Sequence, residues 1–419
     1  ATLTDTATAT ATSTPSPRPT RAQASVLVVD STADPGQVGD TRLSLREALL
    51  LATGRLRPQA LSASEQRQVQ GSPGAAASDL IVFDPAVFPP AAPQTIYVQP
   101  PLATPAASVT PGAAAFSLDY TVRPGLPPLS TGDDRIVGTG SGVILAAGIG
   151  ELGFDGLVIT SAGNAVRGLT LHSFNAGVVI SEAGADNELG GRLPGEGLTL
   201  VRNMVGLVMT GPEVTANRVY GSRIGLTAAE TFDEGNGTHG ILIERGAHHN
   251  SIGDVPDLGI IGGGGVDMPA NCIGGNQQAG VAVIGTGSDG NRIDGNKIGT
   301  DSAALSALPN GIGVLVGGGP AGTVIGGGDA AASGNIISGN VREGILLQSL
   351  STRDTVVQGN SIGAGIDRFR AIPNGADGIL IDDGAHDTLV GGSLVEVGNR
   401  IVFNRGHGVR VRGASSVSN

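Results

Sequence analysis

The amino-acid sequence predicts an all-β fold, a solenoid of parallel β-helix coils with a short α-helix capping its N-terminal end. A short aliphatic strand opened by glycine recurs nine times between Gly156 and Gly408, at intervals of 21 to 40 residues. The 419 residues include 69 glycines, yet only 3% of them are aromatic. Repeats of this length are typical of stacked coils, whose many turns use glycine and whose thin core needs few large side chains.

The composition excludes several other classes of protein. Glycine does not occupy every third position, so the chain is not collagen-like. An apolar content of 40% is too high for a wholly disordered chain, and no apolar run of about 18 residues predicts a membrane span. The single cysteine, Cys272, cannot form an intramolecular disulfide or a zinc site. The net charge of −12 disfavours binding to nucleic acid.

Two further repeats lie between the glycine-opened strands. One has the form Asn/Thr-x-Ile/Val and occurs at 250–252, 291–293, 323–325 and 355–357. The other has the form Asn-x-Ile and occurs at 271–273, 296–298, 335–337, 360–362 and 399–401. Three short strands per period predict one coil of a parallel β-helix, with aliphatic side chains stacked about 4.8 Å apart from coil to coil. The asparagines tolerate the tight corners and can hydrogen-bond along the stack.

A longer period of 64 residues is superimposed on these repeats. It relates Asn271 to Asn335 and Asn399, and the insert at 307–311 to the insert at 371–375. The unit is therefore two coils, one plain and one with an insert. We expect the inserts to project from the same corner of alternate coils, where loops of repeat proteins often bind ligands.

The N-terminal end of the solenoid carries the signature of a capping helix. Ser44 and Glu47 form a capping box, and Gly54 follows as a stop signal. The helix would lie across the first coil with its apolar face inward and cover the open strand edges. The cap residues are Ser44, Leu45, Glu47, Ala48 and Leu49.

These patterns divide the chain into four regions. Residues 1–24 form a Thr/Ser/Pro-rich tether, 25–57 the N-terminal strand and capping helix, 58–150 irregular first coils with long loops, and 151–419 the regular coils. Within 58–150 we expect a loop over 58–78 and strands at 81–83, 95–98, 135–137 and 142–145. No capping device follows Gly408. We therefore expect either that the natural chain continues or that another subunit covers this coil, by end-to-end self-association.

The segment at 29–50 resembles the CSLREA domain, an N-terminal signature of bacterial exported β-helix proteins. Ser44 to Ala48 match this signature, and Leu43 stands at the family's cysteine position. The stretches at 81–84, 93–96, 296–301 and 308–311 are also similar to the family. The resemblance implies a right-handed, pectate-lyase-like parallel β-helix that is secreted or displayed on a bacterial cell surface. It implies no defined reaction.

One group of polar residues near the C-terminal end is a candidate for catalysis. A polygalacturonase-type hydrolase needs clustered carboxylates, and the nearest match is Asp377, Asp382, Asp383 and His407. However, His407 has a repeat equivalent in His239, and Asp382–Asp383 correspond to Glu244–Arg245. We therefore interpret these residues as decoration of repeat turns.

Other candidates are weaker. Lys297, the only lysine, could act as the base of a lyase, but its repeat equivalents are Arg223 and Ser361, which indicates a solvent-facing position. We expect no cofactor, with Ca²⁺ at Asp294 and Asp301 as the alternative. The group of His248, His249, Asp254 and Asp257 is more typical of a solvated loop than of a metal site.

The sequence thus favours a secreted or cell-surface protein that is structural, adhesive or glycan-contacting, without enzymatic activity. The partner would be a polysaccharide or a cell-surface component. The alternative is a polysaccharide lyase, glycoside hydrolase or epimerase that uses a groove of the β-helix, by analogy with other proteins of this architecture. A groove that gathers three or more carboxylate, arginine or histidine side chains is the structural observation that separates these two readings.

Overall fold

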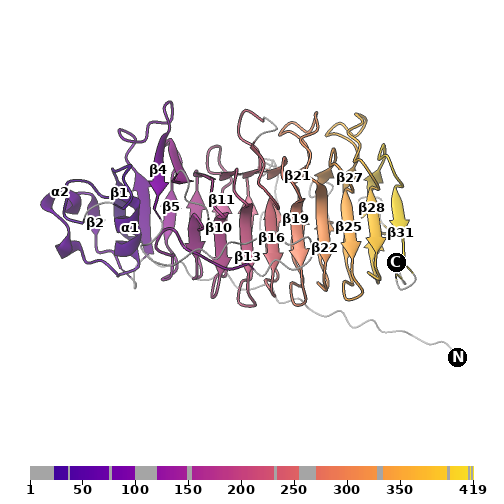
Figure 1. Cartoon of the computed structure of the whole chain (residues 1–419), viewed down its shortest axis with the longest axis horizontal. Coiled ribbons are helices and arrows are strands. Elements are labelled where there is room, and N and C mark those ends of the chain that lie inside the picture. The colour runs from indigo at the N-terminus through magenta and orange to yellow at the C-terminus, as the bar shows by residue number, and fades with distance from the viewer. Residues whose placement is uncertain are drawn as a thin grey trace, which may run out of the picture.

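The protein is an elongated stack of parallel coils (Figure 1). The computed structural model describes residues 23–35, 38–74, 78–99, 120–148, 153–230, 234–253, 270–327, 334–393, 397–413, 416 and 419. The predicted tether therefore lies almost wholly outside the described residues. The architecture confirms the predicted all-β parallel β-helix. None of the helices in the described ranges is long and apolar enough to cross a membrane.

Three parallel sheets run the length of the rod, and each regular coil contributes one strand to each sheet. The 12-stranded sheet holds the Asn/Thr-x-Ile/Val repeats. Its strands are β1 (Gln23–Val29), β2 (Val69–Gly71), β3 (Ser78–Phe83), β5 (Arg135–Val137), β8 (Ala165–Arg167), β11 (Glu188–Gly190), β14 (Arg218–Tyr220), β17 (Ser251–Gly253), β20 (Arg292–Asp294), β23 (Val324–Gly326), β26 (Val356–Gln358) and β29 (Leu389–Val390).

The ten-stranded sheet comes next along each coil and holds the Asn-x-Ile repeats. Its strands are β4 (Gln94–Val98), β6 (Val143–Ala147), β9 (Thr170–His172), β12 (Thr199–Val201), β15 (Arg223–Ile224), β18 (Cys272–Ile273), β21 (Lys297–Ile298), β24 (Ile336–Ile337), β27 (Ser361–Ile362) and β30 (Arg400–Ile401).

The nine-stranded sheet is built from the glycine-opened repeats and completes each coil. Its strands are β7 (Leu157–Ile159), β10 (Ala176–Ser181), β13 (Val205–Thr210), β16 (Ile241–Glu244), β19 (Ala279–Ile284), β22 (Ile312–Gly317), β25 (Ile345–Gln348), β28 (Ile379–Asp382) and β31 (Val409–Val411).

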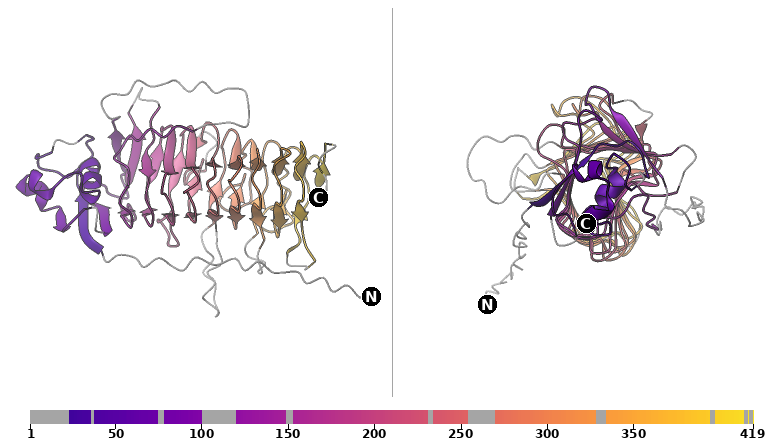
Figure 2. Two further views of the ribbon diagram at one scale, coloured as in Figure 1. Left: turned by 90° about the horizontal axis from the view of Figure 1, so that it is seen from below. Right: turned by 90° about the vertical axis from the view of Figure 1, so that its left-hand side faces the viewer.

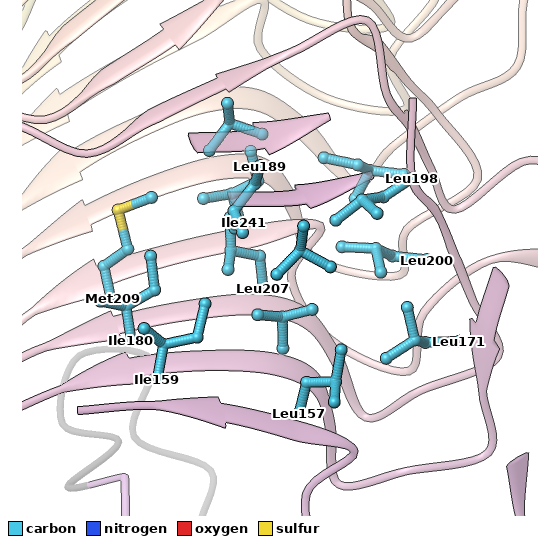
Figure 3. Packing of buried hydrophobic residues seen from close by; sticks show 14 of the residues in the cluster. Leu157, Ile159, Leu171, Ile180, Leu189, Leu198, Leu200, Leu207, Met209 and Ile241 are labelled. Atoms are coloured by element: carbon cyan, nitrogen blue, oxygen red, sulfur yellow. The ribbon is translucent and has the colours of Figure 1, made fainter. Parts of the chain in front are cut away.

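The core is a column of aliphatic side chains contributed by all three sheets. Figure 3 shows Leu157 of β7, Leu171 of β9 and Leu189 of β11 pointing into the same interior. Alternate residues of every strand face inward, and nearly all of the inward residues are inaccessible to solvent. The few aromatic residues of the core lie near the N-terminal end, where Phe83 packs on Phe88 and Phe154 on Phe174. The core of the thin regular coils further on consists almost wholly of aliphatic side chains, with Met209 among them, as the composition predicts.

Stacked asparagines satisfy the backbone at the corners, as the sequence predicts. In each ladder, the backbone N–H and Nδ2 of one asparagine donate to the Oδ1 of its equivalent in the next coil, as from Asn164 to Asn187. Three such ladders run along the described part of the rod, and their asparagines are buried except for Asn399 and Asn404, which are partly exposed. Their members are 164, 187, 217, 250 and 291 in the first, 203, 236, 276, 310, 340, 374 and 404 in the second, and 271, 296, 335, 360 and 399 in the third.

The predicted N-terminal cap is confirmed. Helix α1 (Leu45–Ala52) begins at Ser44, which accepts a hydrogen bond from Glu47 N, while Glu47 accepts one from Ser44 N. Its apolar face, which includes Leu45, Ala48 and Leu49, is fully buried across the end of the coils (Figure 2, right). Arg46 pairs with Asp34 and donates to two backbone carbonyls of the first coils, so it fixes the cap in place.

The region after α1 differs from the loop predicted over 58–78. It holds a 3₁₀ turn η1 (Pro58–Ala60), a short helix α2 (Ala63–Gln66) and the strand β2. Ser62 and Glu65 form a second capping box that starts α2. Strand β2 pairs antiparallel with β1 and thereby covers the edge of the 12-stranded sheet.

The inserts of alternate coils project from the corner between the ten-stranded and nine-stranded sheets, as predicted (Figure 1). They follow β15, β21 and β27. Their described residues are 225–230 and 234–240 in the first, 299–311 in the second and 363–378 in the third, whereas the intervening coils turn this corner through 274–278, 338–344 and 402–408. Two inserts close with an antiparallel bridge at their base, Thr300 to Ala307 and Ala364 to Ala371. Equivalent inserts therefore have equivalent geometry.

Candidate functional site

The outer face of the nine-stranded sheet carries three columns of side chains. The first column precedes each strand-opening glycine, the second lies in mid-strand, and the third lies at the strand end. In the middle coils all three are largely apolar, for example Ala279, Ala282 and Ile284 on β19. In the last three described coils the first and third columns become charged or polar, and the mid-strand column becomes charged only at Arg410. Because the backbone register is unchanged, only the side chains distinguish the two parts of this face.

Tyr120 covers the outer face over the early coils. It packs with Val179, Val208 and Leu242 of the mid-strand column in a second apolar cluster. Its hydroxyl donates to Asp155, and its backbone N–H donates to Glu244 at 3.1 Å. Burial raises the pKa of Asp155 to about 6, and burial also raises the pKa of Tyr120. This part of the face is therefore closed by the chain itself.

An open groove lies over β25, β28 and β31 on the same face. Its volume is about 470 Å³. The charged and ionisable side chains that line it are Arg342, Glu343, Asp377, Asp382, Asp383, Arg405, His407, Arg410 and Arg412. All four residues that the sequence singled out as a hydrolase-like group are thus brought together here, with five others.

Asp377 and His407 form a hydrogen-bonded pair at the start of β28 and β31. They lie in the first column, directly before Gly378 and Gly408, so consecutive coils place them side by side. Asp377 Oδ1 lies 3.0 Å from His407 Nδ1 and accepts the backbone N–H of His407. The carboxylate is only 7% exposed, whereas the imidazole is 66% exposed. Since Nδ1 faces the carboxylate, Nε2 is the ring nitrogen available to a ligand.

Asp382 is held by an arginine of the next coil. Its two carboxylate oxygens accept hydrogen bonds from Nε and Nη2 of Arg412, which lies just after β31. The Arg412 guanidinium holds the pKa of Asp382 below its usual range. Asp382 is the last residue of β28, so the structure places it inside the strand and not in the turn that the sequence suggests. Asp383 follows in a left-handed conformation, with φ of 48°.

Four further charged residues complete the groove. Glu343 precedes Gly344 in the same column as Asp377, and its Oε2 lies 3.4 Å from Arg342 Nη2. Arg410 Nη1 lies 3.8 Å from Asp377 Oδ2. Arg405 makes no ion pair with any carboxylate of the described residues. The groove therefore holds four arginines in addition to the Asp377–His407 pair.

Sequence reasoning missed these arginines, although one carries a readable signal. The mid-strand outward position is aliphatic in every earlier glycine-opened strand, as in Leu346 and Leu380. Arg410 interrupts that pattern at the equivalent position of β31. A charged residue at a position that is otherwise apolar indicates a change in what that surface contacts.

The repeat equivalents of the candidate residues lie in different surroundings. His239 occupies the same column as His407, but it is buried, its Nδ1 accepts the N–H of Ala279, and burial lowers its pKa to about 4. Glu244 occupies the column of Asp382 and contacts Tyr120. The repeat relation predicted from sequence is therefore correct for position, while the chemistry of the two sets differs.

The remaining candidates do not form a site in the described part of the chain. Lys297 lies in register with Arg223, Cys272 and Ser361, but it is half-buried, and its ammonium donates to the Ser302 carbonyl. The Ca²⁺ candidates are engaged elsewhere, since Asp294 pairs with Arg292, and Asp301 accepts the N–H of Leu305. Among the described residues, no three His, Cys, Asp or Glu side chains could hold a metal together. Of the four residues of the loop group, Asp254 and Asp257 lie outside the described residues.

Comparisons with known proteins add two distant structural neighbours. No family model matches this chain, and no curated protein matches it either. The A-module of the Azotobacter vinelandii mannuronan C-5 epimerase AlgE4 is 14% identical, with a TM-score of 0.41, over 82% of this chain and 92% of that chain. The A-module of AlgE6 from the same organism is 15% identical, with a TM-score of 0.31, over 81% and 92%. At this level of similarity, neither module supports a conclusion about the groove.

Proposed function

We propose that this protein binds an anionic polysaccharide in the groove over β25, β28 and β31. The observation that carries the proposal is the set of four arginines, at 342, 405, 410 and 412, around the Asp377–His407 pair. A guanidinium matches the two oxygens of a uronate carboxylate, and it does so better than an ammonium group. The proposal keeps the protein outside the cell, which rests on the resemblance of residues 29–50 alone.

The distribution of charge supports an anionic ligand at this end of the rod. Residues 334–419 hold eight arginines and eight acidic residues, so the net charge of −12 is carried by the rest of the chain. A polyanion is repelled least at the C-terminal coils. Within the groove, Arg405 has no carboxylate partner, and Arg410 meets Asp377 only at 3.8 Å. Both guanidinium groups retain hydrogen-bond donors for a ligand.

The carboxylates of the groove lie on a rigid part of the fold. Asp377 and Asp382 lie directly beside or on β28, whose inward residues Ile379 and Ile381 are buried in the core, whereas the residues of β31, which carries Arg410, are exposed. Side chains on a sheet lose less freedom on binding than side chains on a loop, so the two carboxylates are preorganised.

Calorimetry with the purified protein tests the proposal. We expect it to bind polyuronates such as alginate and polygalacturonate, to bind neutral glucans more weakly, and to lose affinity as salt is raised. Arg410→Ala should weaken polyuronate binding about tenfold or more, because it removes charge-assisted hydrogen bonds. Arg353→Ala is the matched control, since Arg353 is an exposed arginine paired with Asp354 outside the groove. Equal affinity of wild type and Arg410→Ala would overturn the proposal.

A second candidate function is catalysis at the same site, which the Asp377–His407 contact favours. A carboxylate that orients Nδ1 of an imidazole prepares Nε2 to accept a proton. With a uronate in the groove, Nε2 would take the proton from the carbon beside the carboxylate, while the arginines stabilise the negative charge that develops on that carboxylate. Delivery of a proton from solvent to the opposite face of that carbon gives the epimer. Alternatively, the carbon–oxygen bond to the glycosidic oxygen on the adjacent carbon breaks, the leaving oxygen takes up the proton from Nε2, and an unsaturated end forms.

Product analysis separates catalysis from binding alone. Incubation of polyuronate in deuterated water should place deuterium at that carbon or release unsaturated ends, and His407→Ala should abolish either result. His386→Ala is the matched control, because His386 contacts Asp387 in the same manner but outside the groove. A wild type that binds polyuronate without either product would limit the function to binding.

A further inference from the structure

The three inserts contact one another and form a continuous ridge. Ser302 N–H of the second insert donates to Glu230 Oε1 of the first at 3.0 Å. Ile366 N–H of the third donates to the Ala304 carbonyl of the second at 3.1 Å. Arg370 Nη1 donates to the Leu305 carbonyl at 3.2 Å. The inserts are therefore packed parts of the structure, and the third is braced by the second.

The tip of the third insert presents an aromatic ring to solvent. Asp367 Oδ1 accepts the backbone N–H groups of Phe369 and Arg370, and Arg368 between them has a φ of 62°. This turn holds Phe369 outward, and the residue is 79% exposed. Exposure of a large aromatic side chain to water is energetically unfavourable. A structured turn that holds such a side chain outward is therefore typical of a contact surface.

Arginines neighbour that ring, one in space and two in sequence. Arg400, from the next coil, lies with its guanidinium carbon 5.6 Å from the ring centroid of Phe369, and its Nε donates to the Arg368 carbonyl. Arg368 and Arg370 flank the ring in sequence. Within the described ranges, no carboxylate lies in ion-pair distance of any of these three guanidinium groups. The tip therefore holds three arginines against one carboxylate, that of Asp367, and is locally positive on a protein whose net charge is −12.

We propose that this tip, formed by Arg368, Phe369, Arg370 and Arg400, is a second subsite for the anionic polysaccharide, an inference that rests on the proposed function. The open face of the Phe369 ring takes the apolar face of a sugar ring, and the arginines take its carboxylates. The same insert continues to Gly375 and Asp377, which line the groove. Arg400 belongs to the same coil as His407 and Arg410. One polymer of repeating carboxylates reaches both arginine groups around this corner.

Basic side chains beside exposed apolar ones also suit an anionic membrane surface, and Leu305 and Ile366 are exposed beside Phe369. The net charge of −12 opposes approach to an extended anionic surface, whereas a thin polymer meets only the two basic regions. The polysaccharide is therefore the ligand that the charge distribution favours.

Chain length distinguishes a second subsite from the groove. Affinities are measured for long polyuronate and for a trisaccharide that one subsite can hold. Phe369→Ala and Arg370→Ala should each weaken binding of the long polymer about tenfold and of the trisaccharide much less, because the tip adds affinity only through a linked ligand. Arg410→Ala should weaken both. Leu350→Ala, a change at an exposed leucine of another corner, is the control.

The outcomes separate the two proposals. Long-polymer affinity that is unchanged in both tip variants, while Arg410→Ala still weakens it, overturns the second subsite and leaves the proposed function standing. Absence of polyuronate binding in the wild type overturns both. Binding to phosphatidylglycerol vesicles that Phe369→Ala abolishes, with polyuronate affinity unchanged, identifies the tip as a membrane contact and overturns the inference.

Discussion

The acidic side chains at the two ends of the solenoid lie in opposite surroundings. Near the N-terminal end, Asp79, Asp134 and Asp155 are buried, and burial raises the pKa of each, to about 7 for Asp134 and about 6 for Asp155. Near the C-terminal end, Asp382 faces Arg412, which lowers its pKa. The same coil geometry holds both sets. The difference shows that the fold neutralises acids by burial at one end and keeps them ionised, next to arginines, at the other.

Asp134 extends the first asparagine ladder by one coil towards the N-terminus. Asp134 stands one coil before Asn164 and accepts a hydrogen bond from Asp79 N–H, as each asparagine does from the preceding coil. Thr131 donates a hydrogen bond to Asp134 Oδ2. In the next coil, the equivalent Ser161 instead accepts a hydrogen bond from Asn164 Nδ2. Asp134 is thus an acid at an amide position, and this explains why its charged form is disfavoured.

The largest expected effect concerns the buried cap. Leu49→Ala should lower the free energy of unfolding by about 2–5 kcal/mol, because Leu49 is fully buried between α1 and the first coils. Leu350→Ala, at an exposed corner near the other end, should change it by less than about 0.5 kcal/mol. Chemical denaturation measures both. Equal losses in the two variants would show that the cap contributes no more than an ordinary surface residue.

The second prediction uses the raised pKa of Asp134. Below its unfolded pKa, the folded and unfolded states are both protonated and the stabilisation is fully present. As pH rises towards about 7, only the folded state retains the proton, so the free energy of unfolding falls. Asp134→Asn removes this fall and should be more stable than wild type at pH 8, by about 2–4 kcal/mol.

Denaturation curves collected from pH 4 to pH 8 test it. Asp354→Asn is the control, because Asp354 is exposed and paired with Arg353. A wild-type stability that does not fall relative to Asp134→Asn over this range would contradict the assignment of Asp134 to a ladder position.

A third and smaller effect is expected within the neutral ladder. Asn276 Oδ1 accepts from Asn236, and its Nδ2 donates to Asn310, both at 2.8 Å. Asn276→Ala leaves these buried partners unsatisfied and should cost about 1–3 kcal/mol. The neighbouring exposed Gln277→Ala should cost little. Thermal unfolding of the two variants decides, and a loss confined to Gln277→Ala would contradict the stabilising role of the ladder.

The smallest effect on stability is expected in the groove. Arg412→Ala should let the pKa of Asp382 rise towards its usual range, while the melting temperature changes little, because Arg412 is 56% exposed and an ion pair with an exposed partner contributes little to stability. A lowered pKa stabilises the fold above the unfolded pKa, and that contribution disappears as pH falls through the folded pKa. Carboxyl NMR titration of Asp382 measures the shift. An unchanged titration in Arg412→Ala would remove the contrast between the two ends.

Local patterns predicted most of the fold but only part of the groove. The three repeats, the Ser44–Glu47 capping box and the inserts were readable because each depends on neighbouring residues or on a fixed period. Helix α2 was missed although Ser62 and Glu65 repeat the same capping signal within a polar segment. The position of Tyr120 over Asp155 and Glu244 had no local signal, because 124 residues separate Tyr120 from Glu244.

For the groove, the sequence predicted which residues come together but not how exposed they are. The sequence identified Asp377, Asp382, Asp383 and His407 and showed that repeat equivalents exist for three of them. It could not show that His239 would be buried while His407 is exposed, since that depends on what packs over each coil. Equivalent positions in a solenoid share their backbone geometry, but their solvent exposure is set by the neighbouring coils and inserts.

The asparagine ladders make the rod directional and connect successive coils in the same way at every step. Every link donates the same way, from one coil to the Oδ1 of the next, and the 64-residue unit begins and ends on the same amide. A copy of residues 271–334 inserted before Asn335 would present asparagine to asparagine at both junctions and add one more insert to the ridge. The solenoid is therefore a molecule that can grow by tandem duplication without a new fold having to form, and each added unit would bring another insert whose tip is free to vary.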